Sequence, residues 1–431
     1  MPSISNQVDT LVTRVHARYT ACYFKQSDNY QYTVLAAFVL ESPYAPSTGY
    51  FSHPDNYKVV ALATGVKCLP TDRYPLRGDA LHDSHAEVLA RRAFIRWLHE
   101  EVQRAVHASK GSMWIKQRTD GKWELGEGVK LHMYISTVSC GDASMRFLAS
   151  SQDPAMAALK DAAPPASPPP GAASRGRNNY ALHTVLRTKP GRADSPPTIC
   201  MSCSDKIAVY NVLGVQGALA ANLFAPIYLS RIIIGDVPEH MQDVVRLDCE
   251  RAFYRRLDSI QGLPDSYHLT RPTIYFTHVD FENSRTALQG KYPKRPLPQS
   301  SNESLCWFAD SVGGKGQEVI INGIRRGVGP KQLGLERFRP LLCKLQLFRL
   351  HEQTKNVLGL PPTPLGRSYH TAKQSDPAYT RARSLVKGPG GPFAGWIVSG
   401  EQYEAFDVDG DILGEIPTEG TPNVLGTRTI D

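Results

Sequence analysis

Four segments of the chain are rich in β-branched and aromatic residues, a composition typical of strands. They cover residues 31–40, 57–66, 130–138 and 226–235. Two further segments, 84–107 and 204–224, carry apolar residues at helical spacing. Because strand and helix patterns alternate along the chain, we predict an α/β core in which helices cover a sheet.

Two stripes of apolar residues predict amphipathic helices. The first stripe lies near the N-terminus and consists of Val8, Leu11, Val12, Val15 and Tyr19. The second lies in the 84–107 segment and consists of Ala86, Leu89, Ala90, Ala93, Phe94, Trp97 and Leu98. Asp83 or Ser84 can cap this second helix. Ser84 and Glu87 also match a capping box, in which the Glu87 carboxylate bonds the backbone at the helix start.

The segment 151–180 interrupts these patterns, because it is dense in Pro, Ala, Ser and Gly and can bury little apolar surface. Strand and helix patterns continue on both sides of it. We therefore interpret it as a mobile insertion within one domain that spans residues 1–431, rather than as a domain boundary. Basic residues gather in the region 323–391. No repeat of about 20–50 residues is visible, which argues against a solenoid.

The composition of the 431-residue chain is globular, with 41% hydrophobic residues and no apolar run long enough to cross a membrane. Its formal net charge is +8, an excess that fits a polyanionic partner such as nucleic acid. The eight cysteines are too sparse for a disulfide framework, and only Cys200 and Cys203 lie close together, as C-x-x-C. Because the N-terminus lacks the apolar run of a signal peptide, we expect an intracellular protein of the cytoplasm, the nucleus or both.

One histidine and two cysteines stand where they could bind a metal. His85 precedes Glu87 by two residues at the start of the 84–107 helix. Cys140 follows a predicted strand, and Cys203 comes just before a predicted helix. One histidine nitrogen and two thiolates are good zinc ligands, and a fourth position left to water is typical of a catalytic site. Glu87 could take a proton from that water, as the alternative to its capping role.

The pattern H-x-E followed by P-C-x-x-C is typical of zinc-dependent deaminases of nucleosides and bases. This chain departs from the pattern, because Ser139 stands in place of the proline and Ala143 in place of the second cysteine. The second thiolate must therefore come from elsewhere in the chain. Cys200 and Cys203 are both candidates for it.

Four sequence blocks resemble the RNA adenosine deaminases, and they occur in the same order. They are "DSHAEVLARR", "YISTVSCGDAS", "MSCSDKIAVYNVLGVQGAL" and "PIYLSRIIIG". The resemblance runs from about residue 45 to about residue 405, with 151–180 unmatched. It implies a mixed sheet flanked by helices, like that of cytidine deaminases, enlarged by a mostly helical C-terminal part.

The resemblance implies that His85, Cys140 and Cys203 bind Zn²⁺, and that Glu87 shuttles protons while adenosine becomes inosine. Within the family the chain looks most like the branch that acts at position 37 of alanine tRNA, just 3′ of the anticodon. No double-stranded-RNA-binding domain precedes the match, and "RTKPGRADS" is similar to a loop of that branch. The expected partner is therefore the anticodon stem-loop of alanine tRNA, and no obligatory protein partner is implied.

The resemblance also implies a buried inositol hexakisphosphate behind the active site. Such an anion needs many basic and hydroxyl donors, because burying its charge unpaired would be prohibitive. The matching positions are Arg91, Arg92, Lys206, Lys331, Tyr369, Lys373, Tyr379, Arg383 and Trp396. The chain departs from the family pattern at Cys200, Val209, Val398 and Ser399. Arg381 and Lys387 could complete the thinner set of ligands that results.

A polar chain is expected to link this anion to the zinc and to tune the electrostatics around the metal. By the resemblance it consists of Lys206, Gln216, Asp83 and Lys189. Asp83 would then have a second role beside helix capping.

Contacts to the substrate are implied in two places. The loop 189–196 corresponds to the base-flipping loop of the family, and its Arg192 and Asp194 could fill the vacated space or contact phosphate. An ordinary Gly-Pro turn is the alternative interpretation. Val66 and Lys67 correspond to residues that line the nucleoside pocket near the ribose.

These observations support three hypotheses about function. The first is a zinc-dependent tRNA adenosine deaminase. The second is an enzyme that edits duplex RNA with the help of a duplex-binding partner. The third is a catalytically silent RNA-binding scaffold, which is disfavoured because such proteins usually lack the glutamate or a metal ligand. A deaminase of free nucleosides is disfavoured by the large basic C-terminal half and by the wide separation of the cysteines.

Overall fold

The computed structural model describes residues 4–43, 56–108, 111–150, 171–176, 180–191, 195–311, 316–332, 334–364 and 366–414. Its helices are α1 (Ile4–Thr20), α2 (Ala86–His107), α3 (Met145–Ser150), α5 (Cys203–Leu213), α6 (Gly217–Ala220), α7 (Gln242–Phe253), α8 (Arg285–Lys291), α9 (Lys344–Val357), α10 (Tyr369–Ala372) and α11 (Pro377–Lys387). Its longer strands are β2 (Leu35–Glu41), β3 (Tyr57–Thr64), β8 (Lys130–Ile135), β11 (Leu229–Ile234), β12 (Thr273–Phe276), β14 (Glu303–Phe308) and β15 (Gln317–Ile321). Its short strands are β1 (Gln31–Tyr32), β4 (Val66–Cys68), β5 (Asp83–His85), β6 (Ile115–Gln117), β7 (Trp123–Leu125), β9 (Ser174–Arg175), β10 (Arg187–Thr188), β13 (Gln299–Ser300) and β16 (Ile324–Arg325).

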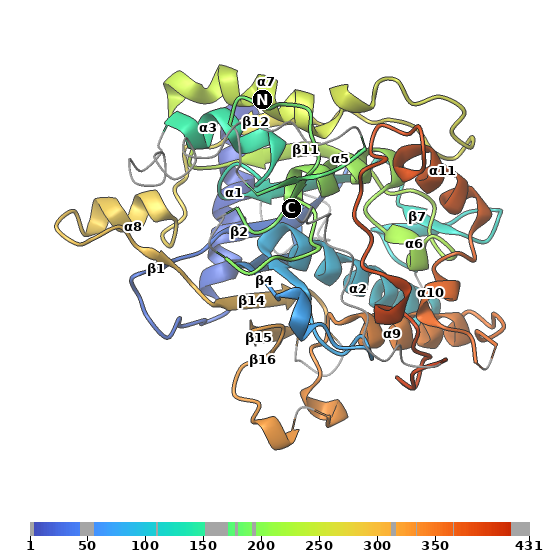
Figure 1. Ribbon diagram of the computed structural model, residues 1–431. Coiled ribbons are helices and arrows are strands. Elements are labelled where there is room, and N and C mark those ends of the chain that lie inside the picture. Colours follow the sequence, from blue (N-terminus) through green and yellow to red (C-terminus); the bar gives the residue numbers. More distant parts are fainter. Residues whose placement is uncertain are drawn as a thin grey trace, which may run out of the picture.

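One mixed sheet of eight strands forms the centre of the described structure (Figure 1). The strand order is β12-β11-β8-β2-β3-β14-β15-β16. β8, β11 and β12 run parallel to one another, whereas every later neighbour pair, from β8–β2 to β15–β16, is antiparallel. The predicted fold class, a mixed sheet flanked by helices, is confirmed.

Helices cover both faces of this sheet, and β2 shows how the sequence produces this arrangement. Phe38 of β2 stacks on Phe94 of α2, with ring centroids 5.2 Å apart. The next residue, Val39, packs in the cluster that contains Val12 of α1. Successive side chains of a strand point to opposite faces, so an unbroken apolar strand needs a helix on each side. Both predicted helical stripes are buried, and they lie on opposite faces of the sheet.

The start of α2 differs from the prediction. The cap position is occupied by His85, whose backbone is extended and whose side chain makes no capping hydrogen bond. The proposed capping box of Ser84 and Glu87 is therefore wrong, and neither Asp83 nor Ser84 is the cap residue. The physical reason is that residues 83–85 form β5, which pairs with β4. Pairing holds the backbone in a strand until α2 begins.

The segment 204–224 also differs, because it is broken rather than one helix. α5 ends at Leu213, and Gly214 follows with a φ of +75°, a left-handed conformation that favours glycine. A Cβ at Gly214 would lie 2.1 Å from Oε1 of Gln216, so a larger residue there would be strained by the positive φ and would also displace the Gln216 side chain. α6 then begins at Gly217. The break turns the chain at the wall of the cavity described below.

The C-terminal part combines both kinds of element. β14, β15 and β16 extend the central sheet, α9 and α10 pack together, and α11 packs against α5 (Figure 1). Most of the predicted insertion, residues 151–170 and 177–179, lies outside the described residues. Among the described helices, none combines the length and the apolarity that crossing a membrane requires.

Candidate active site

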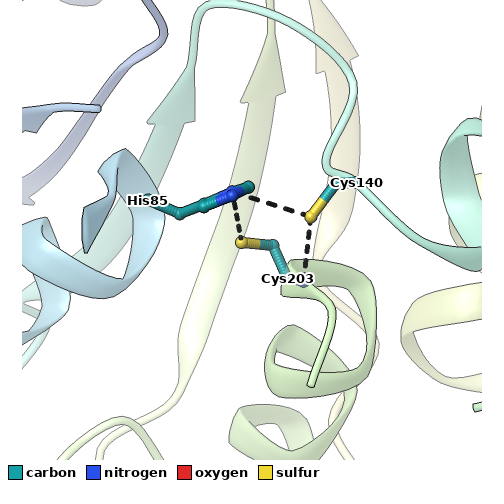
Figure 2. Close-up of side chains that lie close together, drawn as sticks. All are labelled: His85, Cys140 and Cys203. Carbon is teal, nitrogen blue, oxygen red and sulfur yellow. Dashed lines mark hydrogen bonds between the residues drawn. The ribbon is translucent and has the colours of Figure 1, made fainter. Parts of the chain in front are cut away.

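Three metal-binding side chains converge from three elements. His85 ends β5, Cys140 lies in the loop after β8, and Cys203 is the first residue of α5. Nδ1 of His85 lies 3.7 Å from Sγ of Cys140 and 3.6 Å from Sγ of Cys203, as Figure 2 shows. The backbone N–H of Cys203 donates to Sγ of Cys140, at 3.4 Å. The three ligand atoms all lie within 4.8 Å of one another.

The spacing of these atoms fits a zinc ion. Tetrahedral zinc with ordinary Zn–S and Zn–N bonds places a nitrogen and a sulfur ligand about 3.6 Å apart. Both His–Cys distances match that value. Two effects oppose each other at Cys203. The free N–H groups and dipole at the N-terminus of α5 favour the thiolate, whereas burial raises the pKa of the thiol. A site with three protein ligands leaves one tetrahedral position open.

Glu87 lies at the edge of this centre, in the first turn of α2. Its side chain is only 4% exposed. Within the described part of the chain its carboxylate has no hydrogen bond or ion pair of its own. Burial and the nearby Cys140 raise the pKa of the Cys203 thiol, and the charge of Glu87 adds to that rise, so the carboxylate lies near the sulfur. The structure thus places a buried carboxylate beside the cluster of His85, Cys140 and Cys203.

Each cysteine is held in place by an aspartate two residues further along the chain. Asp142 is fully buried and accepts a hydrogen bond from Nε of Arg251 at 3.1 Å. Asp205 is also fully buried and accepts from Arg256 at 2.6 Å. Arg251 belongs to α7, and Arg256 belongs to the short 3-10 helix that follows it at Arg255–Leu257. These aspartates were not predicted, although "CGD" and "CSD" repeat the same spacing.

A buried chain of charges runs away from Cys203. Nζ of Lys189 lies 3.1 Å from Sγ of Cys203 and 2.8 Å from the Asp83 carboxylate. Lys206 forms an ion pair with the same carboxylate. Burial alone would raise the pKa of Asp83, but the charges of Lys189 and Lys206 hold it well below its ordinary value. Gln216 stands apart from this chain, since it bonds the backbone of Leu213 and Ile227.

A cavity of about 750 Å³ lies behind the metal-binding residues, and Asp83 and Lys206 line it. Of the nine positions predicted to bind an anion, the structure brings eight to this cavity. They are Arg91, Arg92, Lys206, Tyr369, Lys373, Tyr379, Arg383 and Trp396. Lys331 lies exposed in a 3-10 helix, Pro330–Gln332, and is not among the lining residues.

The cavity carries an excess of positive charge. Among its described lining residues are seven lysines and arginines but only three carboxylates, those of Asp83, Glu401 and Glu404. Lys387 lies 3.5 Å from the ring centre of Trp396, and burial together with the charge of Arg383 holds its pKa well below the ordinary value. Lys344, at the start of α9, was not predicted and also lines the cavity. Lys344 belongs to no motif identified in the sequence, so only the fold shows that it lies at the cavity.

Comparison with known proteins places this site in a family. The profile of the adenosine-deaminase (editase) domain matches residues 61–399. The chain belongs to this adenosine-deaminase family. It is therefore an enzyme, an adenosine deaminase. The matched region contains His85, Cys140, Cys203, Glu87 and all the cavity-lining residues except Gly400, Glu401 and Glu404.

Several curated relatives are similar to this deaminase over much of their length. A human protein named tRNA-specific adenosine deaminase 1 is 27% identical, over 89% of this chain and 95% of the relative. A fission yeast protein of the same name is 32% identical, over 69% of this chain and 74% of the relative. A Drosophila melanogaster protein named double-stranded RNA-specific editase Adar is also 32% identical, over 63% of this chain but only 38% of the relative.

The remaining predicted residues of the deaminase are placed as follows. Cys200 does not join the metal-binding cluster, because its Sγ lies 3.2 Å from the hydroxyl of Tyr74 instead. Val66 lies opposite His85 in the β4–β5 pair. Lys67 donates to Oγ of Ser300, at 2.8 Å. The predicted base-flipping residues, Arg192 and Asp194, lie outside the described residues.

Replacement of Asp83 by asparagine is expected to destabilise this deaminase by about 3–5 kcal/mol, because it leaves two buried lysine charges without their counter-charge. Urea unfolding of both proteins at neutral pH measures the difference. The matched control is Asp120→Asn, which removes an exposed ion pair with Arg118 and should cost less than about 1 kcal/mol. Equal stability of Asp83→Asn and the control would contradict the structural role of this charge chain.

Proposed function

We propose that this deaminase converts adenosine to inosine in tRNA, at the nucleoside just 3′ of the anticodon of alanine tRNA. The similarity along nearly the whole length of the human relative, which is named for tRNA, carries the proposal. The match to the fly duplex editase covers only 38% of that protein, so it is weaker support for duplex RNA as the substrate. The positive net charge of +8 suits either RNA.

The chemistry follows from the residues at the centre. His85, Cys140 and Cys203 would hold a zinc ion, since their spacing fits one. Zinc in such a site supplies Lewis-acid activation of the water that attacks C6 of adenine. Lys189 supports the Cys203 thiolate, because its ammonium lies 3.1 Å from the sulfur.

Glu87 would move the protons of the reaction. As a carboxylate it takes one proton from the attacking water and delivers it to N1 of the adenine ring. It then passes the second proton to the leaving amino group, which departs as ammonia. Water is consumed, the C6–N bond breaks and a C6–O bond forms, so adenosine becomes inosine. Burial of Glu87 suits this role, because bulk water cannot compete for the proton.

We further propose that Val66 and Lys67 line the entry to this centre, because β4 lies directly beside His85. Here they would contact the flipped nucleoside at its ribose. The same proposal extends to Arg192 and Asp194 as base-flipping residues, on the family resemblance alone.

The cavity would hold inositol hexakisphosphate. Its excess of cations supports a polyanion, because buried like charges are costly without a counter-charge. A buried terminal nitrogen of the half-buried Arg92 also lacks a hydrogen-bond partner within the described residues, which suits a site for an anionic ligand. Cys200, Val209, Val398 and Ser399 line the cavity but offer few strong donors. Lys344 and Lys387 would supply the donors that these positions lack.

Binding of inositol hexakisphosphate is expected to weaken as the pH rises through about 8. Burial lowers the pKa of Lys344 to about 8, against the opposing effect of Glu404 and with the help of Lys373. Below that pH the lysine is charged and pairs with the anion. Above it, binding must take up a proton, which costs about tenfold in affinity per pH unit for a single proton. Isothermal titration calorimetry between pH 7 and 9.5 measures the slope.

Lys344→Met is the control for this titration, since it removes the proton that binds and keeps a similar side-chain length. Its affinity should be weaker at pH 7 and should change less with pH. A slope identical to that of the unaltered protein would show that Lys344 does not contact the anion.

The direct test of the proposed function is inosine formation in a mixed tRNA pool, read by sequencing, with a perfectly paired duplex RNA as the second substrate. We expect inosine beside the anticodon of alanine tRNA and little in the duplex. The alternative is duplex editing, which the 32% identity to the fly editase supports. It would prevail if the duplex were converted at least as well as tRNA. Zinc binding without conversion of either RNA would favour the scaffold hypothesis.

A further inference from the structure

A cluster of tyrosines and basic side chains lies at one edge of the molecule, where β1 and α8 are neighbours (Figure 1). We call it the tyrosine–arginine surface. It consists of Tyr30, Tyr32, Arg285, Lys291, Tyr292 and Arg295. The three basic side chains are exposed, and the three tyrosines are half-buried.

The basic side chains of this surface have no acidic partners. Within the described residues, no carboxylate forms an ion pair with Arg285, Lys291 or Arg295. Other exposed arginines differ, since Arg255 pairs with Glu250 and Arg271 with Asp258. The three cations are therefore not paired directly within the described residues, although the Asp28 carboxylate accepts a hydrogen bond from the Tyr30 backbone nearby. The surface keeps an excess of positive charge, with three cations and this one carboxylate.

The tyrosine rings position these cations. The guanidinium of Arg295 lies 5.0 Å from the ring centre of Tyr30 and 4.9 Å from that of Tyr292. The two rings themselves meet edge to face, with centroids 5.5 Å apart. Stacking on rings restrains a guanidinium without using its N–H donors. Those donors stay available for an anionic ligand, and a phosphate group matches their geometry.

The tyrosine–arginine surface connects directly to the candidate active site. Tyr32 of β1 pairs with Ser300 of β13. Ser300 accepts the hydrogen bond from Lys67, and the preceding residue, Val66, lies opposite His85. Three contacts thus lead from the surface to a metal-binding residue. A polymer whose reacting nucleoside sits at the centre can reach this surface with neighbouring nucleotides.

We propose that the tyrosine–arginine surface binds the phosphate backbone of the RNA that carries the reacting adenosine. The inference rests on the proposed function, and it adds a region that binds the substrate outside the candidate active site. Phosphates would bond the restrained guanidinium groups and Lys291. The contacts concern backbone, so they give affinity and orientation rather than sequence preference.

The test is a triple variant, Arg285→Ala with Lys291→Ala and Arg295→Ala, studied with fluorescein-labelled alanine tRNA and with a labelled duplex RNA. We expect the KM for tRNA deamination to rise at least about tenfold, with a smaller effect on kcat. The plot of log affinity against log salt should also lose a slope of about 2–3, because three phosphate contacts are removed. The matched control is Arg118→Ala with Arg255→Ala and Arg271→Ala, three exposed arginines that pair with carboxylates.

The outcomes separate this inference from the proposed function. If tRNA is deaminated and the triple variant keeps the KM and the salt slope of the control, the tyrosine–arginine surface does not bind substrate, and the proposed function stands. If no inosine forms in tRNA but the variant loses affinity for duplex RNA, the surface stands as an RNA contact, and the tRNA assignment falls.

Discussion

Glutamine in place of Glu87 is expected to lower kcat for inosine formation by at least about 10³-fold, the scale of a lost general acid–base. The amide has nearly the same shape as the carboxylate, so it should fill the same buried space in the first turn of α2. It cannot take a proton from water. Because Glu87 is not among the clustered metal-binding residues, zinc should stay bound in this variant.

The measurement is single-turnover deamination of alanine tRNA, with zinc content determined by elemental mass spectrometry on the same samples. Glu100→Gln is the matched control, since it changes another buried glutamate of α2 that pairs with Arg96. That variant should keep the original kcat. A Glu87→Gln enzyme that still forms inosine at the original rate would remove Glu87 from the chemistry.

Alanine in place of Cys203 is expected to abolish both zinc binding and activity. Only His85 and Cys140 would remain as ligands, and two ligands hold zinc far more weakly than three. Zinc in a protein site contributes about 10 kcal/mol or more of binding energy that is available only to the folded state. The variant should therefore also unfold at lower temperature, with a zinc content well below one ion per chain.

Cys200→Ala is the control for this experiment, because Cys200 lies three residues from Cys203 and chemistry alone leaves it as a competing candidate ligand. In the structure the Cys200 sulfur lies beside the Tyr74 hydroxyl, outside the metal-binding cluster. We expect that variant to retain zinc and turnover. The reverse result, with zinc lost from Cys200→Ala and kept by Cys203→Ala, would overturn the ligand assignment.

Much of the fold was predictable because burial leaves a regular mark on a sequence. The apolar stripe of α1 and the strand patterns around Phe38 and Ile233 correspond to buried faces in the structure. Periodicity reports which side chains are buried, and here every predicted stripe is buried. It does not report what they pack against, so the opposite placement of α1 and α2 could not be predicted from the pattern.

The predictions that proved wrong also have physical causes. The sequence at Ser84 matches a capping box, but residues 83–85 pair with β4 instead. Asp83 also bonds two lysines that are more than 100 residues away in sequence. The helix break at Gly214 depends on a left-handed φ. The glycines at 214 and 217 permit such a break, but the continuing apolar pattern does not show where the helix ends. Lys344 enters the cavity only because α9 is brought there by the fold.

The candidate metal ligands were more predictable than the residues that hold them in place. His85, Cys140 and Cys203 were chosen for their chemistry and their position at element ends, and the structure brings them together. Their roles as zinc ligands, like that of Glu87, stay predictions for the experiments above. Lys331 failed to reach the cavity, since a match of residue type in an exposed loop says little about where that loop lies.

The paired aspartates beside the cysteines have an evolutionary consequence. Cys140 and Cys203 are 63 residues apart in sequence. Asp142 and Asp205 nevertheless attach both to one short stretch of backbone, through Arg251 and Arg256. Thr184 and Arg187 of the intervening chain bond the same two aspartates through their backbone N–H groups. Selection for a fixed spacing of the two sulfur atoms therefore extends to arginines and backbone positions that lie outside the metal-binding cluster.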